Sequence, residues 1–129
     1  MTKALYIYYN LVIPIDIYKK YNRMYINKED DSLRVISGKA RGIKLESLEG
    51  ENTRPTLDRI KESLFNIIQF NIQDAVVLDL FAGSGSLGIE TLSRGAKEVV
   101  FCDDSLLAIK TINTNLERTR IYRAFYSYK

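Results

Sequence analysis

The middle of the chain combines short strand-like apolar runs with segments of helical periodicity. Residues 33–37 and 42–45 are strand-like, and the residues between them (38–41) are typical of a hairpin turn. Apolar residues then recur at helical spacing over residues 56–70, which predicts a helix. The buried stripe of that helix is expected to be Leu57, Ile60, Leu64, Ile67 and Ile68. This part of the chain therefore predicts a hairpin (residues 33–45) followed by a helix.

A strand, a glycine-rich turn and a second strand–helix pair follow. Residues 75–81 are apolar apart from one acid, which is typical of a strand covered on both faces in a parallel sheet. The turn leads into a short helix that ends near Arg94, with Gly95 as its cap. A strand over residues 98–102 and a helix capped by Ser105, running to about Arg118, complete a βαβα unit (residues 75–118). The inward side chains of this last helix are expected to be Leu106, Ile109 and Leu116.

The two ends of the chain differ in composition from this middle region. Six of the nine tyrosines lie in the first 25 residues and three in the last eight, whereas all seven glycines lie between Gly38 and Gly95. Because residues 1–32 show neither period, we expect them to be a poorly ordered extension, with a partner-binding arm as the alternative. We expect a partial domain over residues 33–119 and an unrelated tail over residues 120–129.

Cysteine, histidine and hydropathy exclude several classes of protein. The 129 residues include one cysteine and no histidine, which excludes an intramolecular disulfide, the usual zinc sites and Ser–His or Cys–His nucleophiles. We therefore expect a cytoplasmic protein without a metal. The longest apolar stretch, residues 6–18, contains Asn10 and Asp16 and falls short of the roughly 20 residues that span a bilayer. The net charge of +3 is too small to establish a nucleic-acid partner.

The predicted hairpin carries four cations and no acidic residue. They are Arg34, Lys39, Arg41 and Lys44. Cations on a hairpin edge often serve only to discourage strand-to-strand aggregation. Four uncompensated cations on a projecting ribbon are equally suited to contacting phosphates of a nucleic acid. The residues alone favour neither interpretation.

The glycine-rich turn matches the pattern G-x-G-x-x-G over residues 83–88, after a predicted strand and at the start of a helix. Gly83 and Gly85 would let the backbone turn tightly and approach a ligand, and Gly88 would let helix and strand pack closely. Dinucleotide enzymes and methyltransferases both use such loops. The alternative is a tight turn with no ligand at all.

Two acidic residues narrow the choice of ligand. Asp79 lies four residues before Gly83, where it would repel the pyrophosphate of a dinucleotide and attract the ammonium and sulfonium groups of S-adenosylmethionine. Asp103 lies at the end of the next strand, 20 residues after Gly83, and is placed to accept the hydroxyls of a ribose. Because either cofactor has that ribose, Asp79 carries the discrimination. It favours S-adenosylmethionine.

Three segments resemble the RsmD family of 16S ribosomal RNA guanine-N2 methyltransferases. They are residues 33–42 (LRVISGKARG), 53–66 (TRPTLDRIKESLFN) and 77–90 (VLDLFAGSGSLGIE), in the family's order. The resemblance covers about residues 33–116. It implies transfer of a methyl group from S-adenosylmethionine to the exocyclic N2 of a guanine in 16S rRNA.

The resemblance also assigns roles to residues. The implied cofactor-binding residues are Asp79, Phe81, Gly83, Ser84, Gly85, Asp103 and Arg54. Residues 53–56 would lie beside the cofactor and the target base, and the hairpin cations would contact RNA. Asp103 stands where the family more often has a glutamate, which shortens the reach to the ribose.

One motif of the family has no counterpart in the chain. Family members hold the target base with an Asn/Asp-Pro-Pro-Tyr/Phe motif, whereas the only prolines here are Pro14 and Pro55. We therefore expect a Rossmann-like S-adenosylmethionine-dependent methyltransferase fold truncated after the second βα unit, with no catalytic residue in this chain and no activity on its own. The strand over residues 75–81 would then lack a neighbour on one side. The alternatives are a non-enzymatic module that binds RNA or cofactor, and a NAD-dependent oxidoreductase, which Asp79 disfavours.

Overall fold

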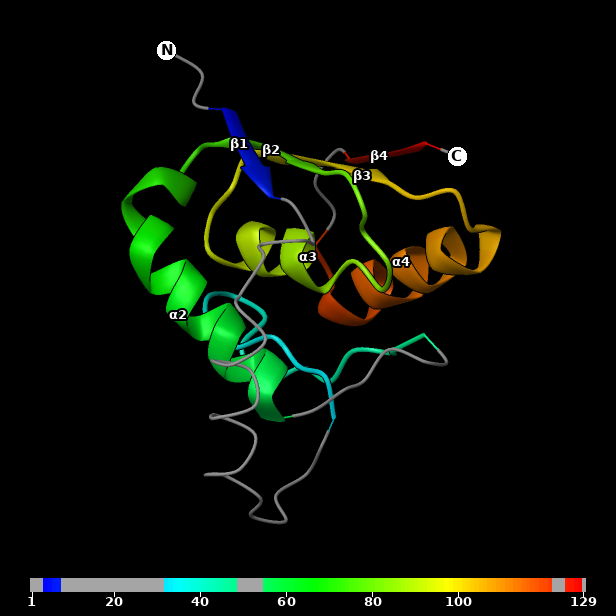
Figure 1. Ribbon diagram of the computed structural model, residues 1–129, viewed down its shortest axis with the longest axis horizontal. Coiled ribbons are helices and arrows are strands. Elements are labelled where there is room, and N and C mark those ends of the chain that lie inside the picture. Colours follow the sequence, from blue (N-terminus) through cyan, green and yellow to red (C-terminus); the bar gives the residue numbers. More distant parts are fainter. Residues whose placement is uncertain (1–3, 8–31, 49–54, 122–124, 129) are drawn as a thin grey trace, which may run out of the picture.

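A computed structural model describes residues 4–7, 32–48, 55–121 and 125–128 of the chain. The elements of the described residues, in chain order, are β1 (Ala4–Ile7), α2 (Pro55–Ile72), β2 (Val76–Asp79), α3 (Ser86–Ser93), β3 (Glu98–Cys102), α4 (Leu106–Thr119) and β4 (Phe125–Tyr128). The strands form one layer, and the three helices lie together on the same side of it (Figure 1). The predicted α/β class and the βαβα unit are confirmed over β2, α3, β3 and α4.

The sheet has the strand order β1-β2-β3-β4, and each neighbouring pair is parallel. The expectation that β2 would lack a neighbour on one side was wrong, because residues Ala4–Ile7 pair with it as β1. On the other side of the sheet, Phe125–Tyr128 pair with β3 as β4. Pairing of a parallel strand satisfies backbone N–H and C=O groups whatever the side chains are. Such short strands therefore left no period in the sequence, and residues 8–31 of the expected extension lie outside the described residues.

The core lies between the sheet and the helices, and Gly88 permits its close packing. Fully buried side chains of β2 and β3 include Val77, Val99 and Phe101, and Ile89 of α3 packs in the same cluster. A Cβ atom on Gly88 would overlap the ring of Phe101. The prediction that this glycine allows helix and strand to approach each other is confirmed.

Helix α2 has a different buried face from the one that its apolar residues predicted. Phe65 and Ile72 are buried, and so is Lys61, whereas Ile67 of the predicted stripe is 78% exposed. The stripe was wrong because the ammonium of Lys61 has an acidic partner inside the protein, so the face that packs inward includes a charged residue. Among the described residues, no helix combines the length and apolar character that crossing a membrane requires.

Helix α4 begins as predicted but turns one expected core residue outward. Ser105 is the N-cap, and its hydroxyl accepts a hydrogen bond from the Ala108 N–H at 3.3 Å. Leu116 is buried as expected and Ile109 is partly buried, but Leu106 is 66% exposed. Leu106 is the first residue of the helix, where the chain has only just left the sheet edge, so its side chain lies outside the packed layer.

The predicted hairpin is present and lies against α3, on the side of that helix away from the sheet (Figure 1). Arg34 and Lys44 face each other as an antiparallel bridge, and the Val35 N–H donates to the Ile43 carbonyl at 3.0 Å. Alternation buries Leu33, Val35 and Leu45 and exposes the cationic residues between them.

Candidate functional site

The turn between β2 and α3, residues 80–85, is called the glycine loop below. Gly83 and Gly85 have φ angles of 55° and 80°, in the left-handed region that favours glycine. The Gly85 N–H donates to the Ala82 carbonyl at 2.7 Å, which closes the turn one residue before α3 begins. The glycine loop therefore lies at the carboxyl end of a central parallel strand, where open α/β sheets bind their ligands.

Asp79 is the last residue of β2 and is completely buried. Its Oδ2 accepts a hydrogen bond from the Gly88 N–H at 3.2 Å, and its Oδ1 has no partner among the described residues. Burial raises the pKa of Asp79 to about 7, an effect that the Gly88 hydrogen bond opposes and the nearby charge of Asp103 reinforces. At neutral pH this carboxyl is therefore divided between its protonated and ionised forms, and a cationic ligand would favour the ionised one.

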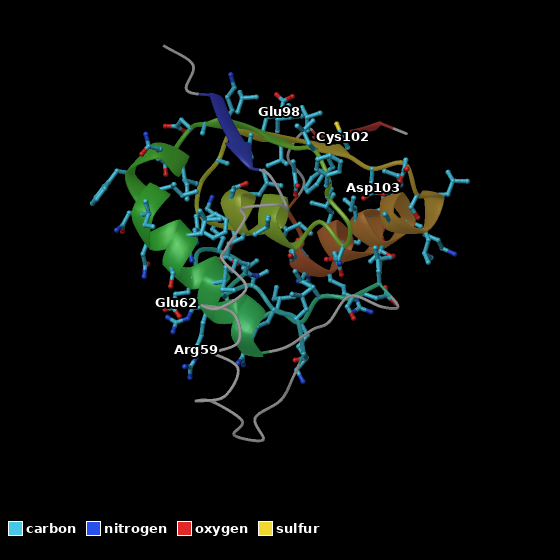
Figure 2. The ribbon with its side chains drawn as sticks, viewed as in Figure 1. Arg59, Glu62, Glu98, Cys102 and Asp103 are labelled. Carbon is cyan, nitrogen blue, oxygen red and sulfur yellow. The ribbon has the colours of Figure 1, made fainter. Side chains whose placement is uncertain are left out.

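Asp103 follows β3 and lies at the carboxyl end of the sheet, beside the start of α4 (Figure 2). Its Oδ2 accepts a hydrogen bond from the Gly83 N–H at 2.9 Å, and its Oδ1 accepts one from the Ser105 N–H at 2.9 Å. Each carboxylate oxygen can accept a second hydrogen bond. Asp103 therefore holds the glycine loop and is still able to accept the hydroxyls of a ligand.

These contacts bring four of the predicted cofactor residues to one edge of the sheet. They are Asp79, Gly83, Gly85 and Asp103. The unpartnered buried oxygen of Asp79 suits a cationic group, and the carboxylate of Asp103 suits vicinal hydroxyls. The chemistry of these two acids therefore fits the ammonium, sulfonium and ribose groups of S-adenosylmethionine.

The other three predicted cofactor residues stand differently. Phe81 is 59% exposed within the glycine loop, so its ring is accessible to a ligand. Ser84 is buried, and its carbonyl accepts a hydrogen bond from Asn115 at 2.9 Å. Arg54 lies outside the described residues.

The four hairpin cations are all exposed. Arg34 and Lys44 are cross-strand partners on the outer face, and Lys39 and Arg41 lie in the turn. The turn is shaped by Gly38 and Gly42, whose φ angles are 85° and 83°. The hairpin therefore displays positive charge on the side that faces away from the core, as a phosphate-binding surface requires.

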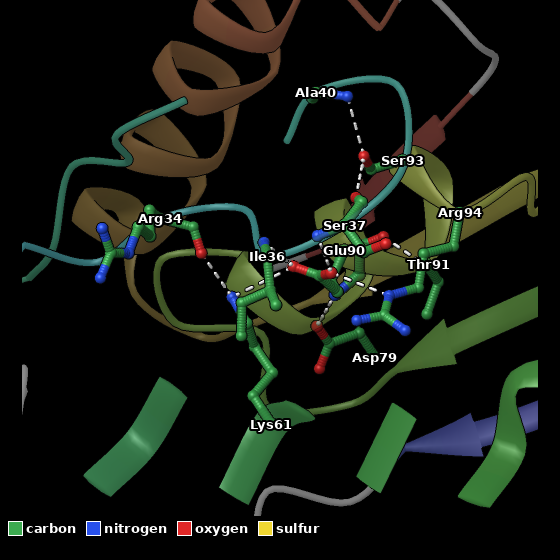
Figure 3. A network of polar contacts seen from close by, with 11 residues as sticks. Arg34, Ile36, Ser37, Ala40, Lys61, Asp79, Glu90, Thr91, Ser93 and Arg94 are labelled. Atoms are coloured by element: carbon green, nitrogen blue, oxygen red, sulfur yellow. Dashed lines mark hydrogen bonds and ion pairs between the residues drawn. The ribbon is translucent and has the colours of Figure 1, made fainter. Parts of the chain in front are cut away.

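A buried acid that the sequence analysis did not single out anchors the hairpin to α3 (Figure 3). Both carboxylate oxygens of Glu90 accept backbone hydrogen bonds from the hairpin, from Ile36 at 2.9 Å and from Ser37 at 3.0 Å. The same oxygens pair with Lys61 of α2 at 3.3 Å and with Arg94 at 2.8 Å. Glu90 is completely buried and Lys61 is 4% exposed, so this cluster joins the hairpin, α2 and α3 inside the protein.

Two further polar side chains complete the attachment of the hairpin. The hydroxyl of Ser93 accepts from the Ala40 N–H at 2.9 Å and donates to the Ser37 carbonyl at 2.6 Å. Asn115 of α4 bonds to the backbone of Glu46, just after the hairpin. The signal that could have found Glu90 and Asn115 is a polar residue within the inward stripe of a helix.

A family model described as conserved hypothetical protein 95 matches residues 33–129. The chain belongs to this family. The resemblance of its motifs to the RsmD family is thereby confirmed, since relatives in the same comparison are named ribosomal RNA small subunit methyltransferase D. The matched region runs through β4 and so includes residues 120–129, for which the motifs gave no resemblance.

Named relatives and a solved structure agree with this assignment. The Bacillus subtilis protein YlbH, provisionally named an rRNA methyltransferase, is 44% identical over 97 residues, which is 75% of this chain and 53% of that protein. Ribosomal RNA small subunit methyltransferase D of Haemophilus influenzae is 47% identical over 85 residues, 66% of this chain and 44% of its own. An Escherichia coli structure provisionally named a methyltransferase superposes with a TM-score of 0.68 at 37% identity, covering 76% of this chain and 52% of that one.

The chain thus spans about half the length of the family members that it matches. The glycine loop, Asp79, Asp103 and the hairpin all lie inside the matched region. In the part of the chain that the structure describes, no three Asp, Glu or Cys side chains are grouped as metal ligands.

Proposed function

We propose that this chain is the cofactor-binding portion of an S-adenosylmethionine-dependent methyltransferase that modifies guanine N2 in 16S rRNA. The observation that carries the proposal is the pair of acids at the carboxyl ends of β2 and β3, joined through the glycine loop. Membership of the family and the names of its relatives support the reaction class and the ribosomal substrate.

Each part of the site has a role in binding the cofactor. Asp79 would attract a cationic group, since its Oδ1 is buried without a partner among the described residues. Asp103 would accept the ribose hydroxyls with the same carboxylate that fixes the Gly83 N–H. Phe81, exposed in the glycine loop, would contact an apolar face of the cofactor, and Arg54 would lie nearby. When bound, S-adenosylmethionine would supply an electrophilic methyl group.

The hairpin would supply affinity for rRNA. Its four exposed cations are displayed on a ribbon that Glu90, Ser93 and Asn115 hold against the domain, so their positions relative to the glycine loop are fixed. Phosphate contacts of this kind give affinity and orientation without reading sequence. The choice between edge protection and RNA contact is therefore proposed in favour of RNA.

We further propose that these 129 residues bind the cofactor but transfer no methyl group by themselves. The Asn/Asp-Pro-Pro-Tyr/Phe motif that holds the base in the family is not among them. Without it the guanine amino group would not be oriented, and losing orientation can forfeit on the order of 7 kcal/mol of barrier lowering. The absence of this motif from the chain also favours the second candidate, a module that binds RNA and cofactor without catalysis.

Calorimetry on the full chain tests the cofactor assignment. We expect binding of S-adenosylmethionine and S-adenosylhomocysteine, and weaker binding of S-adenosylmethionine by Asp79→Ala. Tighter binding of a nicotinamide dinucleotide would contradict the methyltransferase proposal. Radiolabelled methyl transfer to 30S subunits separates the two candidates: clear turnover by these residues alone would show that catalytic groups lie within them.

A further inference from the structure

We propose that Asn115 is a positioning residue that ties the glycine loop to the hairpin, so that a ligand fixing one of these segments also orders the other. The inference rests on the proposed function for the identity of the two ligands. Its structural core, a single buried side chain shared by both segments, can be tested without either ligand.

Asn115 contacts both segments from the middle of α4. It is completely buried. Its Nδ2 donates to the Ser84 carbonyl in the glycine loop at 2.9 Å and to the Glu46 carbonyl at 2.9 Å. Its Oδ1 accepts from the Glu46 N–H at 2.7 Å. Residues that lie 38 positions apart in sequence, 46 and 84, thus share one side chain.

The side-chain amide is the chemical group that these three partners require. An amide offers an acceptor and two N–H donors, and here the acceptor meets an N–H while the donors meet two carbonyls. It pairs with Glu46 at two points, as the backbone of a neighbouring strand would. An aspartate at this position would present a carboxylate to two carbonyl oxygens, and an alanine would leave all three backbone groups without their partner.

Glu90 provides a comparison because it holds the other part of the same hairpin. Its described bonds go to Ile36 and Ser37 of the hairpin and to the cations Lys61 and Arg94. Asn115 differs in that one of its bonds goes to the glycine loop itself. Loosening the hairpin through Glu90 should therefore leave the glycine loop in place, whereas loosening it through Asn115 should disturb both.

The experiment compares Asn115→Asp with two other variants of the full chain. Asn113→Asp is the matched control, since Asn113 lies on the same helix with its side chain exposed. Glu90→Gln loosens the hairpin alone. Amide hydrogen exchange is followed by NMR at Glu46, at Gly85 of the glycine loop and at Ile36, without ligand and with S-adenosylhomocysteine, whose affinity is measured by calorimetry.

We expect Asn115→Asp to speed exchange at both Glu46 and Gly85 and to weaken S-adenosylhomocysteine binding about tenfold, the effect of one lost buried hydrogen bond. Asn113→Asp should match the wild type, and Glu90→Gln should speed exchange at Ile36 only. In the wild type, S-adenosylhomocysteine should slow exchange at Glu46. Restored affinity in Asn115→Asp would be expected only from a substitution that regains an N–H donor, such as reversion to asparagine.

Three results would overturn the proposal. They are unchanged exchange at Gly85 in Asn115→Asp, equal loss of affinity in Glu90→Gln, and no response of Glu46 to a ligand that binds. If Asn115→Asp does not fold, the ligand response of the wild type decides. If the wild type binds no S-adenosylhomocysteine, the proposed function fails on cofactor, while exchange at Glu46 and Gly85 in the ligand-free variants still tests the tie.

Discussion

The glycine loop and the hairpin are two short segments with two left-handed glycines each, yet they are held in place by different means. In the glycine loop, backbone groups make the key contacts close in sequence: Gly85 bonds to Ala82, and the loop follows directly from β2. In the hairpin, the turn is local but its attachment uses the side chains of Glu90 and Asn115, more than 50 residues away. The shape of the first is local, whereas the position of the second depends on distant buried polar groups.

This difference teaches where the energy of each segment lies. The glycine loop depends on backbone freedom and on close packing at Gly88. The hairpin depends on a buried ionic cluster in which one carboxylate serves two cations and two N–H groups. Removing one member of such a cluster costs more than removing a methyl-sized contact, because a charge is left buried without its partner.

The largest effect is therefore expected from Glu90→Ala. The substitution leaves the ammonium of Lys61, which is 4% exposed, without its carboxylate, and it removes the acceptors of Ile36 and Ser37. Breaking a buried pair in this way should lower the free energy of unfolding by about 3–5 kcal/mol. Urea unfolding followed by circular dichroism measures it.

The control for this prediction is Glu62→Ala on α2, next to Lys61 in sequence but with its side chain exposed. It should change stability by less than about 0.5 kcal/mol. A loss in Glu90→Ala no larger than in this control would mean that the hairpin is held by its apolar residues and that the ionic cluster contributes little.

The same difference explains what the sequence could predict. The glycine loop, Asp79, Asp103 and the βαβα unit were predicted, because backbone conformation and strand order leave local patterns at those residues. The buried face of α2 was not, since Lys61 reads as a solvated residue until Glu90 is known to lie opposite it. β1 was missed for a related reason: four residues pairing with a strand some 70 positions later leave no periodic signal.

The next largest effect is expected from Gly88→Ala. A Cβ at this position would overlap the Phe101 ring, so the helix and strand must separate or the ring must move. Overpacking of this kind costs about 1–3 kcal/mol. Gly42→Ala is the comparison in the hairpin, where the φ angle is 83° and a Cβ would meet no atom, so that its cost of about 1–2 kcal/mol comes from the backbone alone.

A double-mutant cycle separates the two causes. Phe101→Leu should recover part of the loss in Gly88→Ala and none of the loss in Gly42→Ala. Equal recovery in both backgrounds, measured by thermal unfolding, would show that packing against Phe101 is not what the glycine at position 88 serves.

A third prediction concerns the pH dependence of the glycine loop. Because burial raises the pKa of Asp79 to about 7, its carboxyl is largely protonated at pH 6 and ionised at pH 8. A cationic cofactor binds the ionised form, so binding releases a proton and the affinity for S-adenosylmethionine should rise about tenfold from pH 6 to pH 8. Without ligand the sign is opposite for folding, and this group should lower stability as pH rises through 7.

Asp79→Asn removes the titrating group while keeping the size of the side chain. Calorimetry at pH 6, 7 and 8 should then give an affinity that hardly changes with pH. A wild-type affinity that is flat over this range, or an Asn variant that keeps the full rise, would place the titrating group elsewhere.

The smallest effect on the fold, and the one that belongs to the hairpin alone, is expected from Lys39→Gln with Arg41→Gln. Both side chains are exposed in the turn, so the free energy of unfolding should change by less than about 0.5 kcal/mol. Each cation that contacts a phosphate releases counterions, so losing two should reduce the slope of log affinity against log salt for 16S rRNA by about 1.5. Lys97→Gln with Lys110→Gln removes two exposed cations elsewhere and keeps the net charge matched. If both pairs flatten the salt dependence equally, the hairpin contributes only net charge, and its attachment through Glu90 and Asn115 serves the fold and not the RNA.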